Sequence, residues 1–198
     1  MNNWIWLVLA LFGGLFVIKM MYALSVAVAL PRTRGALYVS TSRALIHAWM
    51  RAVPMGQHQV LMDLGCGDGR VLREACKRYG VRAIGYEVTP LAYIRAKWRT
   101  LGHPGIEVRF QDFWKADLSR ADVVFCYLFP DVLKPLYEKI KAEVRPGAVV
   151  ISANFSIPNL IPSQVLNPGK SLHNDPIYIY KITQSGRNRP MGSTHTRV

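Results

Sequence analysis

The feature that most limits the folds open to this chain is a glycine-rich turn, Asp63-Leu64-Gly65-Cys66-Gly67-Asp68-Gly69-Arg70. A short apolar run, 60–62, precedes the turn, and residues 71–79 carry apolar side chains at helical spacing. A strand that passes through glycines into a helix is typical of a parallel α/β sheet, which binds ligands outside the carboxyl ends of its strands. We therefore expect the chemistry of this protein at its strand ends.

Strand and helix signals alternate along the chain from residue 38 onward, which predicts an α/β fold. The expected strands are 60–62, 83–86, 106–110, 123–128 and 147–152, followed by a terminal hairpin of 164–166 and 177–182. The expected helices are 42–52, 71–79, 90–101 and a fourth that has Pro135 in its first turn and ends near 144.

The N-terminal segment 4–30 is almost entirely apolar, with 23 of its 27 residues hydrophobic. About 20 such residues cross a bilayer as a helix, and the single charged residue, Lys19, can extend its ammonium group toward the interface. We expect residues 1–30 to form a transmembrane anchor. A cleaved signal peptide with Ala27-Val28-Ala29 at its cleavage site is the alternative, but the first eighteen residues contain no Lys or Arg to form its charged region.

The charges that follow the apolar segment predict its orientation. Arg32, Arg34, Arg43 and Arg51 precede the first acidic residue, Asp63, and positive residues beside a membrane span stay on the cytoplasmic side. We therefore expect a single-pass membrane protein with its folded part on the cytoplasmic side or its topological equivalent. The expected divisions are the anchor at 1–30, a basic juxtamembrane linker at 31–37, a folded domain at 38–182 and a flexible basic tail at 183–198.

Composition narrows the possible partners. The chain has 25 Lys+Arg against 12 Asp+Glu, a formal charge of +13. Beside a membrane segment, this excess predicts attraction to anionic lipid near the Arg-rich linker, whereas nucleic acid is not expected because no RNA-binding module is recognisable. The three cysteines form no C-x-x-C pair and the histidines show no ligand spacing, so we expect neither a disulfide scaffold nor a metal site.

Two carboxylates, Asp63 and Asp68, accompany the glycines of the turn. The spacing is G-x-G-x-G rather than the dinucleotide-binding G-x-G-x-x-G, and two negative charges repel a pyrophosphate but attract a ligand that carries an ammonium and a sulfonium. These features predict S-adenosylmethionine as the cofactor. We expect Cys66 to be a small turn residue rather than a nucleophile, because no base lies beside it in the sequence.

Two further acids stand at the next strand ends. Glu87 comes 24 residues after Asp63, where a carboxylate can accept hydrogen bonds from both ribose hydroxyls. Asp112 comes 25 residues later and can accept a hydrogen bond from the adenine amino group, with Phe113 or Trp114 against the ring face. The expected cofactor-binding residues are Asp63, Gly65, Cys66, Gly67, Asp68, Glu87, Asp112 and Phe113.

The motif D-L-G-C-G-D-G-R and the G-Y-E at 85–87 resemble those of the seven-strand class I methyltransferases. Within that superfamily the chain resembles the membrane-anchored protein-lysine methyltransferases of the adenine nucleotide translocase and the ATP synthase c subunit, and their prokaryotic relatives. The resemblance spans about 38–182 and implies a Rossmann-like seven-stranded methyltransferase sheet with helices on both faces, preceded by one transmembrane helix. Its particular elements are Tyr38-Val39-Ser40-Thr41, Gly85-Tyr86-Glu87-Val88-Thr89-Pro90, Asp112-Phe113-Trp114-Lys115 and Tyr127-Leu128-Phe129-Pro130.

The acceptor side is expected at the end of the fourth strand, where the methyl group should emerge. Tyr127 and Phe129 would line this catalytic approach with Tyr38 as a lid, and Asn154 is a weaker polar candidate. An apolar mouth lowers the pKa of a lysine amine by desolvation, and aromatic faces attract a methylated ammonium. We therefore favour a lysine on a membrane-associated protein as the acceptor. A quinone, lipid or other lipid-soluble small molecule is the alternative, and RNA is the second alternative.

Overall fold

The computed structural model describes residues 3–33, 41–167 and 175–183 of the chain. Within them, seven strands form one sheet in the order β3-β2-β1-β4-β5-β7-β6. Strands β1 to β5 are parallel, and β7 lies antiparallel between β5 and β6. This arrangement confirms the predicted Rossmann-like sheet and its terminal hairpin. The strands are β1 Val60–Leu64, β2 Arg82–Glu87, β3 Ile106–Phe110, β4 Val123–Cys126, β5 Val149–Ala153, β6 Gln164–Leu166 and β7 Ile177–Lys181.

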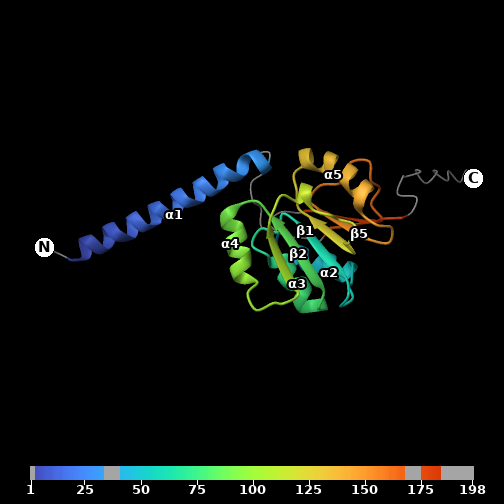
Figure 1. The fold of residues 1–198 in the computed structure, drawn as a ribbon, viewed down its shortest axis with the longest axis horizontal. Helices are drawn as coiled ribbons and strands as arrows, with labels where there is room; N and C mark the ends of the chain where they lie inside the picture. Colours follow the sequence, from blue (N-terminus) through green and yellow to red (C-terminus); the bar gives the residue numbers. More distant parts are fainter. Residues whose placement is uncertain (1–2, 34–40, 168–174, 184–198) are drawn as a thin grey trace, which may run out of the picture.

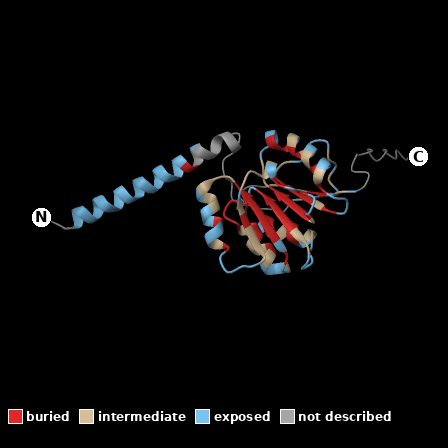
Figure 2. Cartoon of the chain, in the orientation of Figure 1, coloured by how far each residue is buried: buried red, intermediate tan, exposed pale blue. Residues whose placement is uncertain are grey.

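Helices cover both faces of this sheet (Figure 1). Leu61 of β1 shares a buried cluster with residues of α2 (Arg43–Ala52), α3 (Arg70–Tyr79) and α4 (Pro90–Arg99). The next residue, Met62, shares a second cluster with α5 (Pro130–Glu143). Successive side chains of a strand point to opposite faces, so a central strand covered on both sides is apolar throughout. Figure 2 shows the strands almost wholly buried between the helices.

Proline positions explain one difference from the sequence prediction. The sequence places Pro135 in the first turn of its fourth domain helix, but α5 begins five residues earlier, at Pro130, and Pro135 lies inside the helix. That prediction of the helix start is wrong. Proline suits the first helical position because its φ is already helical and its missing N–H has no partner there. Pro130 therefore opens α5, and β4 ends at Cys126 rather than at Leu128.

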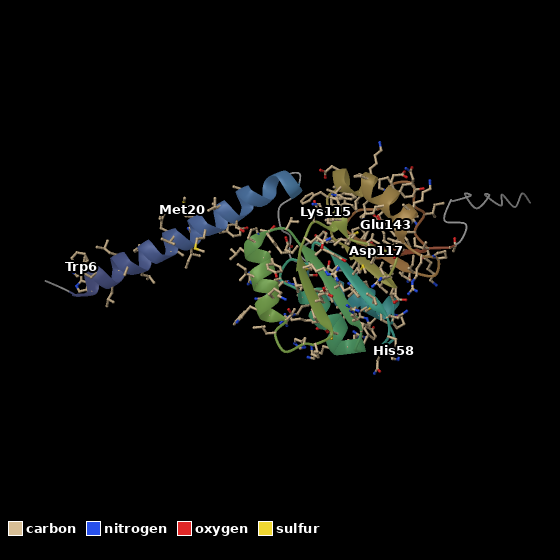
Figure 3. All side chains as sticks on the ribbon, in the orientation of Figure 1. Trp6, Met20, His58, Lys115, Asp117 and Glu143 are labelled. Atoms are coloured by element: carbon tan, nitrogen blue, oxygen red, sulfur yellow. The ribbon has the colours of Figure 1, made fainter. Side chains whose placement is uncertain are left out.

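The N-terminal helix α1 (Asn3–Thr33) projects away from the sheet (Figure 1). Its segment Trp4–Ser25 is 22 residues long, has a mean hydropathy of 2.2, and is long and apolar enough to cross a membrane. Figure 3 shows the side chains of Trp6 and Met20 projecting from α1 with no part of the sheet domain beside them. Helix α1 continues to Thr33, so the first three residues of the predicted 31–37 linker are helical.

The attachment of α1 to the domain involves a specific hydrogen bond. Ser25 is buried, and its Oγ accepts a hydrogen bond of 3.1 Å from the backbone N–H of Leu91 in the first turn of α4. The N-cap residue of α4, Thr89, makes no side-chain capping bond of its own within the described part of the chain. Ser25 therefore satisfies one of the N–H groups that a helix leaves unpaired at its start.

Candidate active site

The glycine turn between β1 and α3 shapes the carboxyl edge of the sheet. Gly65, Gly67 and Gly69 have φ angles of +98°, +56° and +74°, a region that residues with a Cβ rarely adopt. The Tyr86 carbonyl of β2 accepts hydrogen bonds from the amides of both Gly65 (3.0 Å) and Cys66 (2.9 Å). The turn is therefore left-handed at alternate residues and tied to the neighbouring strand.

Gly85 of β2 lets the turn lie directly on that strand. A Cβ at this position would lie 2.5 Å from Cδ1 of Leu72 and 2.7 Å from both Cβ and Sγ of Cys66. Cys66 is thus a packed turn residue. Burial, together with the charges of Asp63 and Glu87, raises the pKa of its thiol well above the ordinary value. The thiol stays protonated, which disfavours a role as a nucleophile.

Asp63 lies at the centre of the site with its carboxyl group buried. It is in register with Gly85 of β2 and Phe125 of β4, and no donor among the described residues hydrogen-bonds its side chain. Burial raises the pKa of this carboxyl well above its usual range, and the negative charges of Glu87 and Asp68 raise it further. A buried carboxyl without a donor is a ready partner for a cationic group of a ligand.

Glu87 ends β2 with its carboxylate already oriented. Oε2 accepts a hydrogen bond from the N–H of Gly67 (2.9 Å), and Oε1 accepts two, from Val88 (2.9 Å) and Thr89 (2.8 Å). A carboxylate has about four acceptor positions, so room is left for further donors such as ribose hydroxyls. Glu87 and the glycine turn form one unit held together by the Gly67 bond.

Asp68 is placed differently from the other two acids. Its buried carboxylate receives Nε (2.9 Å) and Nη2 (2.8 Å) of Arg70 and also pairs with Arg99 of α4. Burial acts to raise the pKa of Asp68, but the hydrogen bonds and charge of Arg70, together with the charge of Arg99, outweigh it and lower that pKa. Asp68 thus links the turn to two helices, and its direct contact with a cofactor remains a prediction.

Asp112 stands just after β3, as the sequence predicts. One of its oxygens, Oδ1, accepts a hydrogen bond of 3.0 Å from the N–H of Trp114 and caps the short 3₁₀ helix η1 (Phe113–Lys115). The rings of Phe113 and Trp114 pack on each other at 4.7 Å and against the α5 side of the core. The observed cap leaves the predicted adenine contact possible, because Oδ2 of Asp112 makes no hydrogen bond with a described residue.

The predicted acceptor residues follow β4 directly and lie beside the glycine turn. A Cβ on Gly65 would be 3.8 Å from Cδ2 of Leu128, so this segment is close to van der Waals contact with the turn. Phe129 is the N-cap residue of α5 and is 38% exposed. Tyr38, the predicted lid, lies outside the described residues.

Tyr127 takes part in an interaction across the sheet. Its hydroxyl donates a hydrogen bond of 2.8 Å to Oδ2 of Asp175, just before β7. Because β7 runs antiparallel to β5, its start lies at the same edge as the ends of the parallel strands. The N–H of Asn154, which follows β5 with a φ of +72°, bonds the Pro176 carbonyl there (2.8 Å). Tyr127, Asn154 and Asp175 therefore gather at this edge of the sheet, where the acceptor side is predicted.

Sequence reasoning does not identify Arg99 or Asp175 as site residues. Arg99 lies 31 positions after Asp68, and Asp175 lies 48 positions after Tyr127. Neither residue belongs to a local motif, so no sequence signal marks these pairs. Among the described residues, no group of three or more His, Cys, Asp or Glu side chains is placed to hold a metal ion.

The site fits S-adenosylmethionine. Asp63 offers a buried carboxyl for the amino group of the methionine part, and Glu87 offers open acceptor positions for the ribose. Asp112 stands at the next strand end for the adenine. The glycines leave room for the ligand to approach the backbone closely.

Comparisons with known proteins agree with this site. Residues 63–164 match the family described as the ANTKMT methyltransferase domain. A protein-lysine N-methyltransferase of Saccharolobus islandicus is 30% identical over 150 residues, which cover 73% of this chain and 92% of the relative. A lysine N-methyltransferase of the ATP synthase c subunit, from Rattus norvegicus, is 31% identical over 176 residues, which cover 85% of this chain and 78% of the relative.

A solved structure extends the agreement to the fold. The crystal structure of an RNA methyltransferase from Salinibacter ruber, in complex with S-adenosyl-L-homocysteine, matches with a TM-score of 0.69 at 27% identity. The match covers 78% of this chain and 98% of that chain. S-adenosylhomocysteine is what remains of S-adenosylmethionine once its methyl group is transferred. The chain therefore belongs to the ANTKMT methyltransferase family, and it is an S-adenosylmethionine-dependent methyltransferase.

Proposed function

We propose that this protein transfers a methyl group from S-adenosylmethionine to the ε-amino group of a lysine on a membrane-associated protein. The observation that carries the proposal is the aromatic segment after β4, in which Tyr127 and Phe129 flank Leu128 beside the glycine turn. The names of the relatives support the acceptor class, since both compared relatives are lysine N-methyltransferases and one is named for a component of ATP synthase.

The residues of the site have to hold the cofactor, align the reactants and exclude water. Glu87 would hold the ribose hydroxyls, Asp63 the amino group and Asp112 the adenine. When bound, S-adenosylmethionine supplies a methyl group already activated on a sulfonium. A covalent nucleophile from the protein is therefore unnecessary, which suits the protonated thiol of Cys66.

A lysine acceptor must lose its ammonium proton to water before its nitrogen attacks the methyl carbon; the carbon–sulfur bond then breaks, and S-adenosylhomocysteine leaves. Burial, followed by the hydrogen bond to Asp175, raises the pKa of Tyr127 above its ordinary value, so the phenol stays protonated and is not the base. Tyr127 instead provides a neutral aromatic wall, which lowers the pKa of a nearby amine by desolvation and attracts its methylated form. Oδ1 of Asp175 accepts no hydrogen bond from a described residue and can attract the incoming ammonium.

The membrane part of the proposal depends on α1. Its segment Trp4–Ser25 is long enough to span, and the side chains from Trp4 to Leu24 are exposed to the surroundings although most are apolar (Figure 2). In water such a surface is unfavourable. A bilayer would cover it, with the arginines that follow on the cytoplasmic side or its topological equivalent. The catalytic domain would then meet membrane proteins and anionic lipid first.

The test is to incubate membranes with the full-length enzyme and methyl-labelled S-adenosylmethionine. We expect mass spectrometry to find label on lysine of a membrane protein, and the signal should be lost with Glu87→Ala, which leaves the ribose hydroxyls and three backbone N–H groups without their acceptor. Lys134→Glu, on the exposed side of α5, is the control that should retain the label. Label on an extracted lipid or quinone, with lysine unmodified, would replace this acceptor with a small molecule.

RNA is the second candidate acceptor, because the Salinibacter ruber neighbour is described as an RNA methyltransferase. The same incubation distinguishes the two acceptors if it includes total RNA. Label on RNA nucleosides, with membrane proteins unlabelled, would overturn the lysine proposal.

A further inference from the structure

Helix α4 carries an apolar stripe on its outer side. Ile94 and Trp98, four residues apart on one face of α4, are 60% and 72% exposed, and Leu101, in the turn just after the helix, is 70% exposed. Leu91, one turn earlier on the same face, is 38% exposed. A soluble helix normally turns its apolar face toward the core, but α4 contacts the core through the fully buried Ala96 and the partly buried Tyr93.

The stripe begins where α1 is attached. Leu91 is the residue whose N–H bonds Ser25 of α1, so the first turn of α4 touches the end of the apolar segment Trp4–Ser25. Trp98 lies seven residues further along, or about 10 Å of helix. Figure 1 shows α4 on the side of the domain from which α1 projects. A membrane that α1 crosses would therefore lie next to this face.

A cationic cavity of about 710 Å³ lies on the flank of the stripe. Arg99, next to Trp98 in sequence, lines it together with Arg43, Arg73 and Lys77, and the one described acid in its wall, Glu74, pairs with His47. The Nε of Arg73 is buried and has no hydrogen-bond partner among the described residues. Because buried donors are normally paired, this group favours an anionic ligand in the cavity.

We propose that the α4 stripe and the cationic cavity together form a docking surface for an anionic phospholipid bilayer. The apolar side chains enter the boundary between headgroups and acyl chains, where Trp is favoured. The cavity takes a lipid phosphate, to which guanidinium groups bind well. The inference rests on the proposed membrane anchor. It adds a second contact that sets which side of the domain faces the membrane.

The experiment uses the full chain with Cys76→Ala, because Cys66 and Cys126 are buried and unreactive. A polarity-sensitive dye is attached to Ile94→Cys or Trp98→Cys, and the protein is reconstituted in vesicles of phosphatidylcholine with phosphatidylglycerol. We expect the dye emission to shift to the blue in the vesicles. When the vesicles contain nitroxide lipids labelled near the headgroup, the dye should lose roughly half its emission or more, because the stripe lies at that depth. Ile161→Cys is the matched control, since Ile161 is 62% exposed but lies before β6, at the opposite edge of the sheet. His58→Cys, at the end of the domain away from α1 (Figure 3), is a second control.

Two further measurements distinguish failure of the docking surface from failure of the proposed membrane anchor. A dye at Trp6→Cys reports whether α1 itself is in the bilayer, through quenching by lipids labelled deep in the acyl chain. Quenching at 6 but none at 94 and 98 would leave the anchor in place and overturn the docking surface. A blue shift at 94 without lipid quenching would also overturn it, because protein rather than lipid would then cover the stripe. Lys77→Glu should reduce the quenching in vesicles that contain phosphatidylglycerol, whereas the control Lys134→Glu should not. If the two variants had equal effects, the cavity would not be part of the docking surface.

Discussion

Three acids lie close together in the cofactor site, and their environments separate their roles. Asp68 is neutralised by two arginines, and Glu87 is held by three backbone N–H groups. Asp63 has neither kind of partner among the described residues and is buried beside both. Its ionised form is therefore unfavourable until a cation arrives, so we expect cofactor binding to be coupled to release of the Asp63 proton.

Asp63→Asn is expected to raise the thermal stability of the cofactor-free protein. The pKa of Asp63 is raised in the folded protein relative to the unfolded chain. The stability contributed by its protonated carboxyl is therefore fully present below the ordinary carboxyl pKa, near 4, and is lost as the pH rises through the raised pKa. Asn removes that loss, so the melting temperature above pH 4 should increase and depend less on pH. Cofactor affinity should fall by about 1.5 to 3 kcal/mol, because the bond to a charged group is gone.

Asp68→Asn is the matched variant, and its expected effect on stability has the opposite sign. The lowered pKa of Asp68 contributes stability above pH 4 that is lost as the pH falls through the lowered value. Removing this charge should therefore reduce stability near neutral pH, by about 1 to 3 kcal/mol. Calorimetry of both variants from pH 4 to 8 decides the matter. Equal melting curves for the two variants would contradict the assigned environments.

A second residue-scale prediction concerns the acceptor side. Tyr127→Ala should reduce the rate of methyl transfer sharply while the cofactor affinity stays within about 1 kcal/mol, because an acceptor contact acts on the transfer step. Asp175→Asn should keep the aromatic wall and raise the KM for the acceptor more than it lowers kcat. Steady-state kinetics with titration of the cofactor separates these effects. If cofactor affinity fell as much as the rate did, Tyr127 would belong to the cofactor side instead.

Strand β2 is the element that organises the site. Its last three residues act in succession: Gly85 leaves space for the turn, the Tyr86 carbonyl holds the Gly65 and Cys66 amides, and Glu87 bonds Gly67. Hydrogen bonds consequently join the turn, β2 and the residues just before α4. A change that disturbs the packing of β2 should therefore lower the affinity for the cofactor.

Gly85→Ala tests this dependence. The new Cβ would meet Leu72 and Cys66 at 2.5 to 2.7 Å, and both are packed in the core. Overpacking of this kind costs about 1 to 3 kcal/mol, so the melting temperature and the cofactor affinity should both fall. Gly56→Ala is the control, because no atom of the described residues lies within 4 Å of a Cβ at that position. A normal cofactor affinity in a destabilised Gly85→Ala protein would show that the turn tolerates the shift.

At the scale of the whole molecule, helix α1 and the cofactor site are close together. Ser25 of α1 bonds Leu91, and Leu91 lies four residues after Glu87 of the cofactor site. Helix α1 therefore contacts the domain near the carboxyl edge of the sheet, where the proposed acceptor mouth also lies. An acceptor held in the same membrane would need to approach over only a short distance.

The topology of the anchor can be checked in intact cells. With the domain on the cytoplasmic side, an impermeant thiol reagent should label a cysteine introduced at Asn2 and spare one introduced at Gly186. The physical reason is the excess of arginines after the span, which resist translocation. The reverse labelling pattern would show that the domain faces the outside.

The local sequence by itself determined the strand–turn–helix unit, the positions of the acids at strand ends and the apolar N-terminal helix. These features depend on short-range periodicity, on glycines that accept a left-handed backbone and on the number of consecutive apolar residues. The start of α5 shows the limit even at this range, since both Pro130 and Pro135 suit a first helical turn, and the structure begins the helix at Pro130 with Leu133 and Leu136 buried in the core.

The tertiary structure alone decided the long-range polar pairs. Ser25 meets Leu91 across 66 positions, Tyr127 meets Asp175 across 48 and Asp68 meets Arg99 across 31. No local pattern encodes such pairs, because they form only after helices and strands distant in sequence pack against the same sheet. The electrostatic difference between Asp63 and Asp68, five residues apart in one motif, has a local and a tertiary part. Arg70, two residues from Asp68, makes the largest contribution to lowering its pKa, and packing adds Arg99, whereas Asp63 has no side-chain partner among the described residues.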